Sequence, residues 1–149
     1  HENGRIIMMI FRPYKHKVQY YETDTMKIVH HSNYVRWMEE ARVDMLEQME
    51  IGYDKMEKAG VLSPVLSVSC EYKAMTRFPE TVEICARLAK YTGVRFDVEY
   101  EIRGADGELK TLCRSSHCFI DESGRPISLR RRFPDWDKVF SSCVQQSLV

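Results

Sequence analysis

The stretch that decides the fold runs from Tyr21 to Trp37 and reads YETDTMKIVHHSNYVRW. It carries two acids, Glu22 and Asp24, followed by two adjacent histidines and an Asn-Tyr pair. Apolar residues then recur at three- and four-residue steps, which predicts an amphipathic helix over residues 33–50. A helix start needs only a short polar cap, so this density of titratable groups marks the stretch as the candidate functional site.

The helix is expected to begin at Ser32 or Asn33 and to end at Gly52. A short second helix over residues 53–59 should stop at Gly60. The apolar stripe of the long helix is rich in methionine and aromatic residues, and we expect it to fill the core rather than to hold a cofactor. Its members are Tyr34, Trp37, Met38, Ala41, Met45 and Met49.

Five segments alternate or carry strand-forming residues, at 15–21, 65–72, 81–90, 94–102 and 109–120. The stretch GADGE between the last two predicts a hairpin turn. The order is therefore β-α-β-β-β-β, which predicts an α+β fold with a curved antiparallel sheet of about five strands around one long helix. The part of the chain from Ser128 onwards is expected to add one short helix or none.

Composition excludes several classes of protein. The 149 residues suit one domain, and 44% hydrophobic with 30% charged residues indicates a globular chain. Lys plus Arg equals Asp plus Glu at 22 each, so no nucleic-acid partner is expected. No apolar run approaches the roughly 20 residues of a membrane helix, and residues 6–11 are too short for a signal sequence, so we expect a cytoplasmic protein. The chain begins with His1 rather than Met, so its first residues are expected to be a trimmed end or a remnant of expression.

Neither disulfides nor a metal site are expected. The cysteine count is odd and no C-x-x-C pair occurs, which favours free thiols used as small apolar residues. His30 and His31 are adjacent, which is awkward for binding one ion, and no third histidine or cysteine stands at ligand spacing. The cysteines are Cys70, Cys85, Cys113, Cys118 and Cys143.

The residues from Tyr21 to Tyr34 resemble the signature of the hotdog-fold 4-hydroxybenzoyl-CoA thioesterase-like family, which includes the Tol-Pal-associated thioesterases. That signature is an aromatic residue, two variable residues, Asp, three small residues, two aliphatics, an aromatic pair or Tyr-His, one residue and Asn-Tyr. WMEEAR (37–42) and SVSCEYKAMTRFPETVEI (67–84) are similar to later family segments. The resemblance covers residues 15–133, which we take as the hotdog domain, with 1–14 as a lead-in and 134–149 as a C-terminal tail.

What the resemblance implies is an acyl-CoA thioesterase without a cofactor, since coenzyme A is part of the substrate. It also implies homodimers or tetramers with active sites between subunits. Two departures from the family pattern stand out. Thr25-Met26-Lys27 replaces a segment that usually contains glycine, and Pro79-Glu80 replaces Gly-Asp. Without glycine a positive φ costs more, so the turn is expected to differ in detail.

Thioester hydrolysis needs a group that attacks the carbonyl carbon and donors for the oxyanion. Asp24 is expected to act as nucleophile or general base, because an aspartate is ionised near neutrality. Free backbone N–H groups at residues 31–33 would be the oxyanion donors, aided by the helix dipole. By resemblance, the N–H of His31 polarises the thioester, while its side chain lines the site.

Substrate-binding candidates are Asn33 and Tyr34, which complete the signature, and the segment Thr92, Gly93, Val94 and Arg95. The resemblance also implies that the nucleotide of coenzyme A binds near the arginines after the last strand, since guanidinium groups bind phosphate well. Other polar residues have ordinary explanations: Glu22 as a solvated acid, His117 as a satisfied structural histidine, and Arg130, Arg131 and Arg132 as a solvated end.

Two alternatives remain open. A hotdog hydratase or dehydratase pairs an Asp with a His in a Gly-Asp-x-Asn-Pro-x-His context, but here the Gly and Pro are missing and the spacing differs. A non-catalytic acyl-CoA-binding module would be expected to lack the acid of the turn, and Asp24 is present. Release of free thiol from acyl-CoA distinguishes the three.

Overall fold

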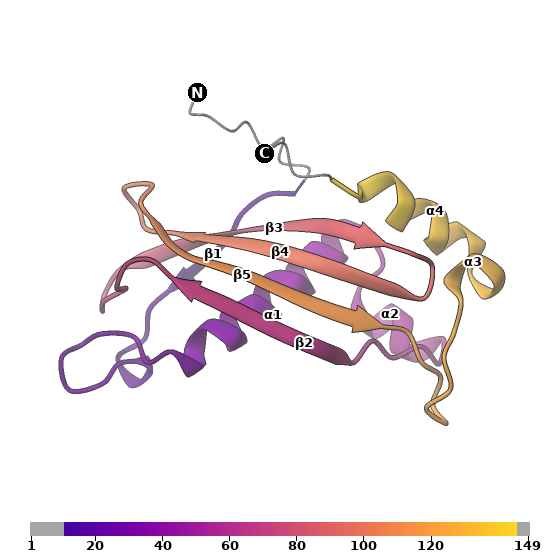
Figure 1. The fold of residues 1–149 in the computed structure, drawn as a ribbon, viewed down its shortest axis with the longest axis horizontal. Helices are drawn as coiled ribbons and strands as arrows, with labels where there is room; N and C mark the ends of the chain where they lie inside the picture. Colours follow the sequence, from indigo (N-terminus) through magenta and orange to yellow (C-terminus); the bar gives the residue numbers. More distant parts are fainter. Residues whose placement is uncertain (1–10, 146–149) are drawn as a thin grey trace.

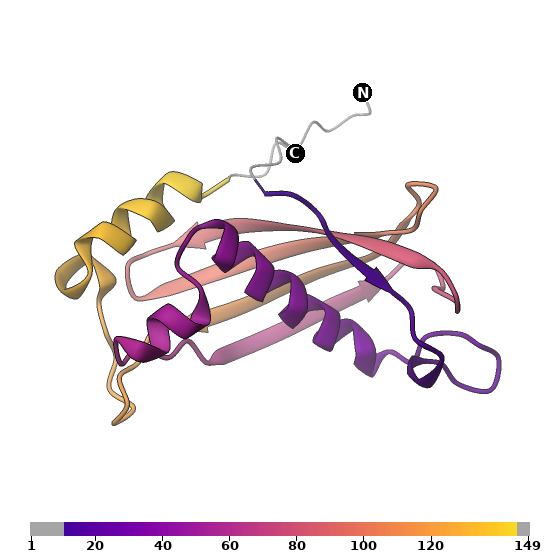
Figure 2. The ribbon, with the colours of Figure 1, turned by 180° about the vertical axis from the view of Figure 1, so that it is seen from behind.

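The computed structural model describes residues 11–145 as one antiparallel sheet packed on a long helix, α1 (Ser32–Gln48). Figures 1 and 2 show α1 lying across one face of the sheet while the other face stays uncovered. The strands, in the spatial order β1-β3-β4-β5-β2, are β1 (Tyr14–Lys17), β2 (Val65–Tyr72), β3 (Thr81–Tyr91), β4 (Arg95–Arg103) and β5 (Leu109–Cys118). The other α-helices are α2 (Tyr53–Lys58), α3 (Leu129–Arg132) and α4 (Pro134–Cys143). The predicted α+β architecture is confirmed.

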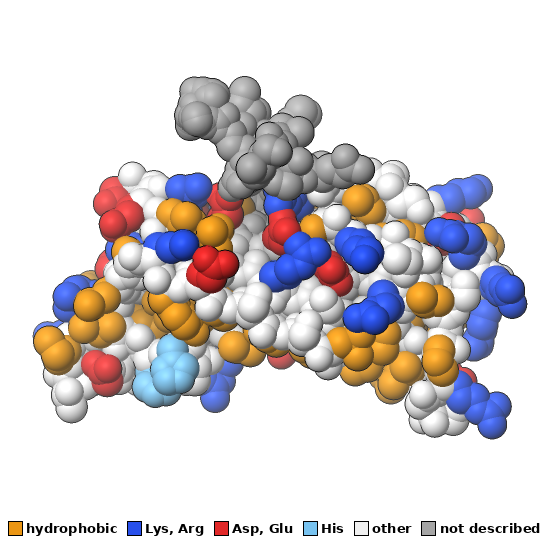
Figure 3. All heavy atoms as spheres, viewed as in Figure 1, with side chains coloured by type: hydrophobic (Ala, Val, Ile, Leu, Met, Phe, Trp, Pro, Cys, Tyr) orange, Lys and Arg blue, Asp and Glu red, His pale blue; other side chains and the backbone are white. Residues whose placement is uncertain are grey.

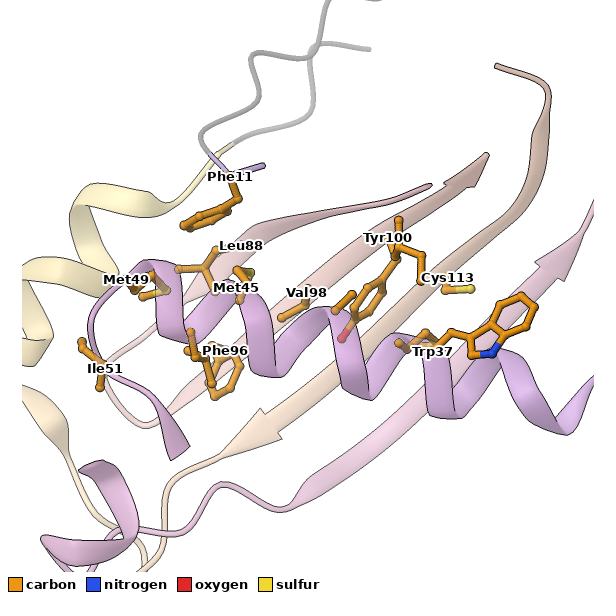
Figure 4. Close-up of a cluster of buried hydrophobic side chains, with 14 of the residues drawn as sticks. Phe11, Trp37, Met45, Met49, Ile51, Leu88, Phe96, Val98, Tyr100 and Cys113 are labelled. Atoms are coloured by element: carbon orange, nitrogen blue, oxygen red, sulfur yellow. The ribbon is translucent and has the colours of Figure 1, made fainter. Parts of the chain in front are cut away.

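The core lies between α1 and the sheet. All six residues of the predicted apolar stripe are buried, so the core role of the stripe is confirmed. Alternate residues of β4 face it from the sheet, as period-two alternation predicts. Figure 4 shows part of this cluster, in which Met45, Val98 and Tyr100 lie between helix and strands.

The end of α1 differs from the prediction. The helix stops at Gln48, and the left-handed residue that follows is Glu50, with φ of 63°. The N–H of Ile51 donates to the carbonyl oxygen of Leu46 at 3.0 Å, which is the six-to-one bond of a Schellman motif. Gly52 instead precedes α2, so glycine was the wrong marker for this helix end.

The first strand is also shorter than predicted. It ends at Lys17, and Tyr20–Glu22 forms a 3₁₀ turn, η1. The carboxylate of Glu22 accepts a hydrogen bond of 2.8 Å from the N–H of Gln19, which turns the chain out of the sheet. Alternation of apolar and polar residues cannot reveal such a side-chain contact.

Two helices follow the last strand where one short helix or none was expected. Phe140 of α4 is fully buried, with its ring centroid 5.4 Å from that of Phe96 and 5.5 Å from that of Phe119. Residues 134–143 therefore extend the core, because partners on β4 and just after β5 stabilise a helix whose own sequence signal is weak.

The uncovered face of the sheet is charged (Figure 3). Arg114 contacts Asp97 at 2.8 Å and also pairs with Glu99, which pairs with Arg87 in turn. Cys113 is buried on the helix side and Cys118 points to the other face, as their odd spacing predicts, and all five cysteines are free. Within residues 11–145, no helix is long and apolar enough to cross a membrane.

Candidate active site

Residues 22–30 form a narrow hairpin that projects at one end of the sheet, beside the start of α1 (Figure 1). Its arms are joined by a bridge between Thr23 and Val29 and by the N–H of His30, which donates to the carbonyl oxygen of Glu22 at 2.9 Å. The N–H of Asp24 donates to the carbonyl oxygen of Ile28 at 3.0 Å. Asp24 therefore stands at the start of the turn, one residue beyond the bridge.

The Asp24 side chain is exposed. Its Oδ1 accepts a hydrogen bond of 3.1 Å from the N–H of Met26, and Oδ2 has no hydrogen-bond partner within residues 11–145. Lys27 takes φ of 61°, so the turn adopts the left-handed conformation without a glycine. The departure in sequence at residues 25–27 is thus accommodated by strain at Lys27 rather than by loss of the turn.

The start of α1 presents one uncommitted backbone donor. The N–H of Asn33 donates to His30 O at 3.0 Å, that of Tyr34 to His31 O at 3.2 Å, and that of Ser32 to His30 Nδ1 at 3.2 Å. The N–H of His31 meets no acceptor in the described part of the chain. Of the three N–H groups expected from the sequence, only the one at His31 is free.

Asn33 and Tyr34 are buried at the start of the helix. The Nδ2 of Asn33 donates to the carbonyl oxygens of Glu22 at 2.9 Å and His30 at 3.2 Å. The ring of Tyr34 packs against Trp37 and, edge-on, against Tyr72. Both residues thus build the scaffold of the hairpin and helix, and their predicted contact with substrate stays a prediction.

The sequence predicts a solvated Glu22, but the structure buries this residue, whose side chain is 4% exposed. Its Oε1 accepts from His16 Nε2 at 2.9 Å, and its Oε2 accepts from the Nε1–H of Trp37 at 2.8 Å. Burial by itself raises the pKa of this carboxyl, but the hydrogen bonds from Gln19, His16 and Trp37 outweigh it and lower the pKa below its usual value. No local pattern signals this contact, because Trp37 lies 15 residues away in sequence.

The segment Thr92–Arg95 forms the β3–β4 turn. Gly93 has φ of 93° and its carbonyl oxygen accepts from the N–H of Leu129 at 2.8 Å. A Cβ at Gly93 would lie 3.6 Å from Cζ of Arg130, so the structure brings this turn and the arginines of α3 together.

The same turn lies far from Asp24. The hairpin of Asp24 pairs with Arg77 through Ile28, just before β3 begins, whereas Thr92 follows its last residue. A strand of 11 residues spans roughly 30 Å, and Figure 2 shows the hairpin and the β3–β4 turn at opposite ends of the sheet.

His117 is fully buried on β5. Its Nε2 lies 2.8 Å from Ser115 Oγ, while its Nδ1 has no partner among the described residues, so only one of its two ring nitrogens is satisfied. Residues 11–145 contain no group of three His, Cys, Asp or Glu side chains that could hold a metal ion.

A model of the family described as the thioesterase-like superfamily matches residues 18–143. The chain belongs to the thioesterase-like superfamily. The match includes the hairpin, α1, the four long strands and α4, whereas His16 of β1 lies just before it.

This thioesterase is 39% identical over 125 residues to a Bacillus subtilis protein provisionally named acyl-CoA thioesterase YneP, covering 83% of this chain and 91% of that protein. It is 35% identical to a DHNA-CoA thioesterase of Staphylococcus aureus, with a TM-score of 0.84 over 87% of this chain and 88% of that one. A 1,4-dihydroxy-2-naphthoyl-CoA thioesterase of Synechocystis, 17% identical, shares the fold with a TM-score of 0.77 over 87% and 94% of the two chains. This thioesterase is accordingly a hotdog-fold thioester hydrolase, as the sequence predicted.

Proposed function

We propose that this thioesterase hydrolyses acyl-CoA with Asp24 as nucleophile or general base and the N–H of His31 as oxyanion donor. The observation that carries the proposal is that one short segment, residues 24–31, presents both an exposed carboxylate on the hairpin and a free N–H at the start of α1. A carboxylate with a free oxygen can attack the thioester carbon or draw a proton from water. The N-terminus of a 17-residue helix favours the negative charge that develops on the carbonyl oxygen.

The coenzyme is proposed to bind across two copies of the chain. Thr92–Arg95 and Arg130 form the predicted nucleotide site, but they lie at the far end of the sheet from Asp24 of the same chain. A second copy that supplies its own β3–β4 turn would complete the site. The edge strand β2 supports such pairing, because Val65, Val68 and Tyr72 are exposed on it and an open apolar edge favours association.

For the acyl group, the similarity to the Staphylococcus aureus DHNA-CoA thioesterase favours an aromatic substrate. The rings of Tyr34 and Tyr72 meet with centroids 5.1 Å apart beside the start of α1, and Tyr72 is half exposed. An aromatic acyl group could pack on such a surface. A panel of acetyl-, palmitoyl-, benzoyl- and 1,4-dihydroxy-2-naphthoyl-CoA, followed by free-thiol release, tests this; highest kcat/KM for an aliphatic member would contradict it.

Asp24→Asn tests the mechanism. The amide keeps an oxygen for the N–H of Met26, so folding should survive, while kcat should fall by about 10² or more, as for loss of a positioned base. KM should change much less, because Asp24 acts on the reacting carbonyl. Retention of more than about a tenth of kcat would contradict the mechanism.

The chain offers a matched control in Asp106→Asn. Asp106 is also an exposed turn aspartate, and its Oδ1 accepts from the N–H two residues later, Glu108, at 2.9 Å. Because it lies in the β4–β5 hairpin and takes no part in the proposed site, its replacement should leave kcat unchanged.

A further inference from the structure

Glu22 joins three parts of the molecule through its carboxylate. One oxygen accepts from the N–H of Gln19 at 2.8 Å and from His16 Nε2 of β1 at 2.9 Å. The other accepts from the indole N–H of Trp37 in α1 at 2.8 Å. The side chain is therefore held on one side by the sheet and on the other by the helix, in a site almost closed to water.

The backbone of the same residue holds the hairpin. The carbonyl oxygen of Glu22 accepts from the N–H of His30 at 2.9 Å and from the amide of Asn33 at 2.9 Å. Those two bonds join the arm that leads to Asp24 with the arm that leads to His31. A single residue thus links both proposed catalytic groups to the rigid frame of sheet and helix.

We propose that Glu22 is a positioning residue of the active site, which holds the Asp24 carboxylate and the His31 N–H in register with each other. This inference rests on the proposed function, because it assumes that these two groups act together. Positioning matters in such a site, since a displacement of about 1 Å can cost up to about 100-fold in rate.

The chemistry of the site explains why a carboxylate is needed there. Three N–H groups, from Gln19, His16 and Trp37, converge on its two oxygens, and an ionised carboxylate accepts all of them. A glutamine has one acceptor oxygen and an NH₂ group, which would meet a donor on one side. Glu22→Gln should therefore keep the shape of the side chain but force the hairpin to shift.

Glu40 provides a matched control on the other side of the same histidine. Its Oε1 lies 3.2 Å from His16 Nδ1 and accepts a hydrogen bond of 2.9 Å from the hydroxyl of Tyr14. It thus ties β1 to α1 as Glu22 does, but no hydrogen bond joins it to the hairpin within residues 11–145. Glu40→Gln measures what the β1–α1 contact alone contributes.

The test compares thiol release by full-length wild type, Glu22→Gln and Glu40→Gln. Each protein is assayed at the same number of degrees below its own melting temperature. We expect Glu22→Gln to lower kcat about 10-fold or more with KM within about three-fold, and Glu40→Gln to change neither. In the Asp24→Asn background, Glu22→Gln should lower kcat by much less, because the two residues act through one step. Equal effects of Glu22→Gln and Glu40→Gln, or a fully additive double variant, would overturn the inference.

Failure of the proposed function gives a different result, since Asp24→Asn would then retain activity whatever Glu22→Gln does. If Glu22→Gln does not fold, Trp37→Phe decides instead, because it removes the indole donor to Oε2 while keeping an aromatic ring in the core beside Tyr34. A several-fold loss of kcat in a folded Trp37→Phe protein supports the inference, and an unchanged kcat overturns it.

Discussion

The backbone N–H of Asp24 donates a hydrogen bond of 3.0 Å to the carbonyl oxygen of Ile28. That bond closes the turn on which the proposed catalytic carboxylate stands, and the N–H of Lys27 returns to Asp24 O at 3.0 Å within it. Closing so few residues requires a left-handed conformation, which falls on Lys27 with φ of 61°. An L-residue in that region carries a cost of about 1 kcal/mol that glycine avoids.

Replacing Lys27 tests this account of the turn. Lys27→Gly relieves the strain but adds freedom to the unfolded chain, so stability should stay within about 0.5 kcal/mol of wild type. Lys27→Val should lose about 1–2 kcal/mol, because a β-branched side chain tolerates positive φ least. Urea unfolding at fixed protein concentration measures both, and equal stability of the glycine and valine variants would contradict the assignment.

His31 allows the backbone donor to be removed by itself. Its φ of −57° matches that of proline, and its N–H has no acceptor within residues 11–145, so His31→Pro should cost little internal hydrogen bonding. If that N–H binds the oxyanion, kcat should fall by about 10² to 10³.

His31→Ala is the control for the side chain. It retains the N–H and loses only an exposed imidazole, so its effect on kcat should be much milder. Steady-state thiol release from the two variants, with circular dichroism to verify folding, makes the comparison. Equal losses of kcat in both would assign the effect to the imidazole rather than to the backbone.

Mixing two variants, each impaired at a different part of the predicted site, tests whether that site lies between copies of the chain. If Asp24 of one copy works with Arg95 of another, Asp24→Asn and Arg95→Ala proteins should restore activity when refolded together. For equal mixing in dimers, half of the molecules are hybrids with one intact site of two, which gives about a quarter of wild-type activity. No recovery, or a monomeric mass by light scattering, would show that each chain works alone.

Stability should fall with acidification because of His117. Burial and the positive charge of Arg42 together lower its pKa to about 3, although Asp97 opposes the shift. Below the ordinary pKa of about 6.5 the unfolded chain binds a proton that the folded chain does not, so stability is present above that pH and declines as pH falls towards 3. For one such proton, the free energy of unfolding should fall by about 1.4 kcal/mol for each pH unit within this range.

The comparison is between wild type and His117→Gln in urea at pH 7 and pH 5, at one protein concentration. Wild type should lose about 2 kcal/mol more than the variant over this interval, since the variant lacks the titrating ring. A parallel decline in both proteins would assign the acid sensitivity to other groups.

The sequence by itself determined the order of elements from β1 to β5, the buried stripe of α1 and the position of Asp24 ahead of a helix start. Those features depend on local rules, namely the periods of helix and strand and the residues that form turns. The stripe from Tyr34 to Met49 is buried as predicted because its spacing places every member on one face of the helix.

Only the tertiary structure decided which groups around Asp24 are free and which are committed. Glu22 reads as a solvated acid in the sequence, yet it is buried because His16 and Trp37 reach it from a strand and a helix. The helix α4 forms because Phe140 finds Phe96 and Phe119 far back along the chain. Such contacts depend on how elements pack in space, and no local pattern of residues encodes a partner that is brought close only by folding.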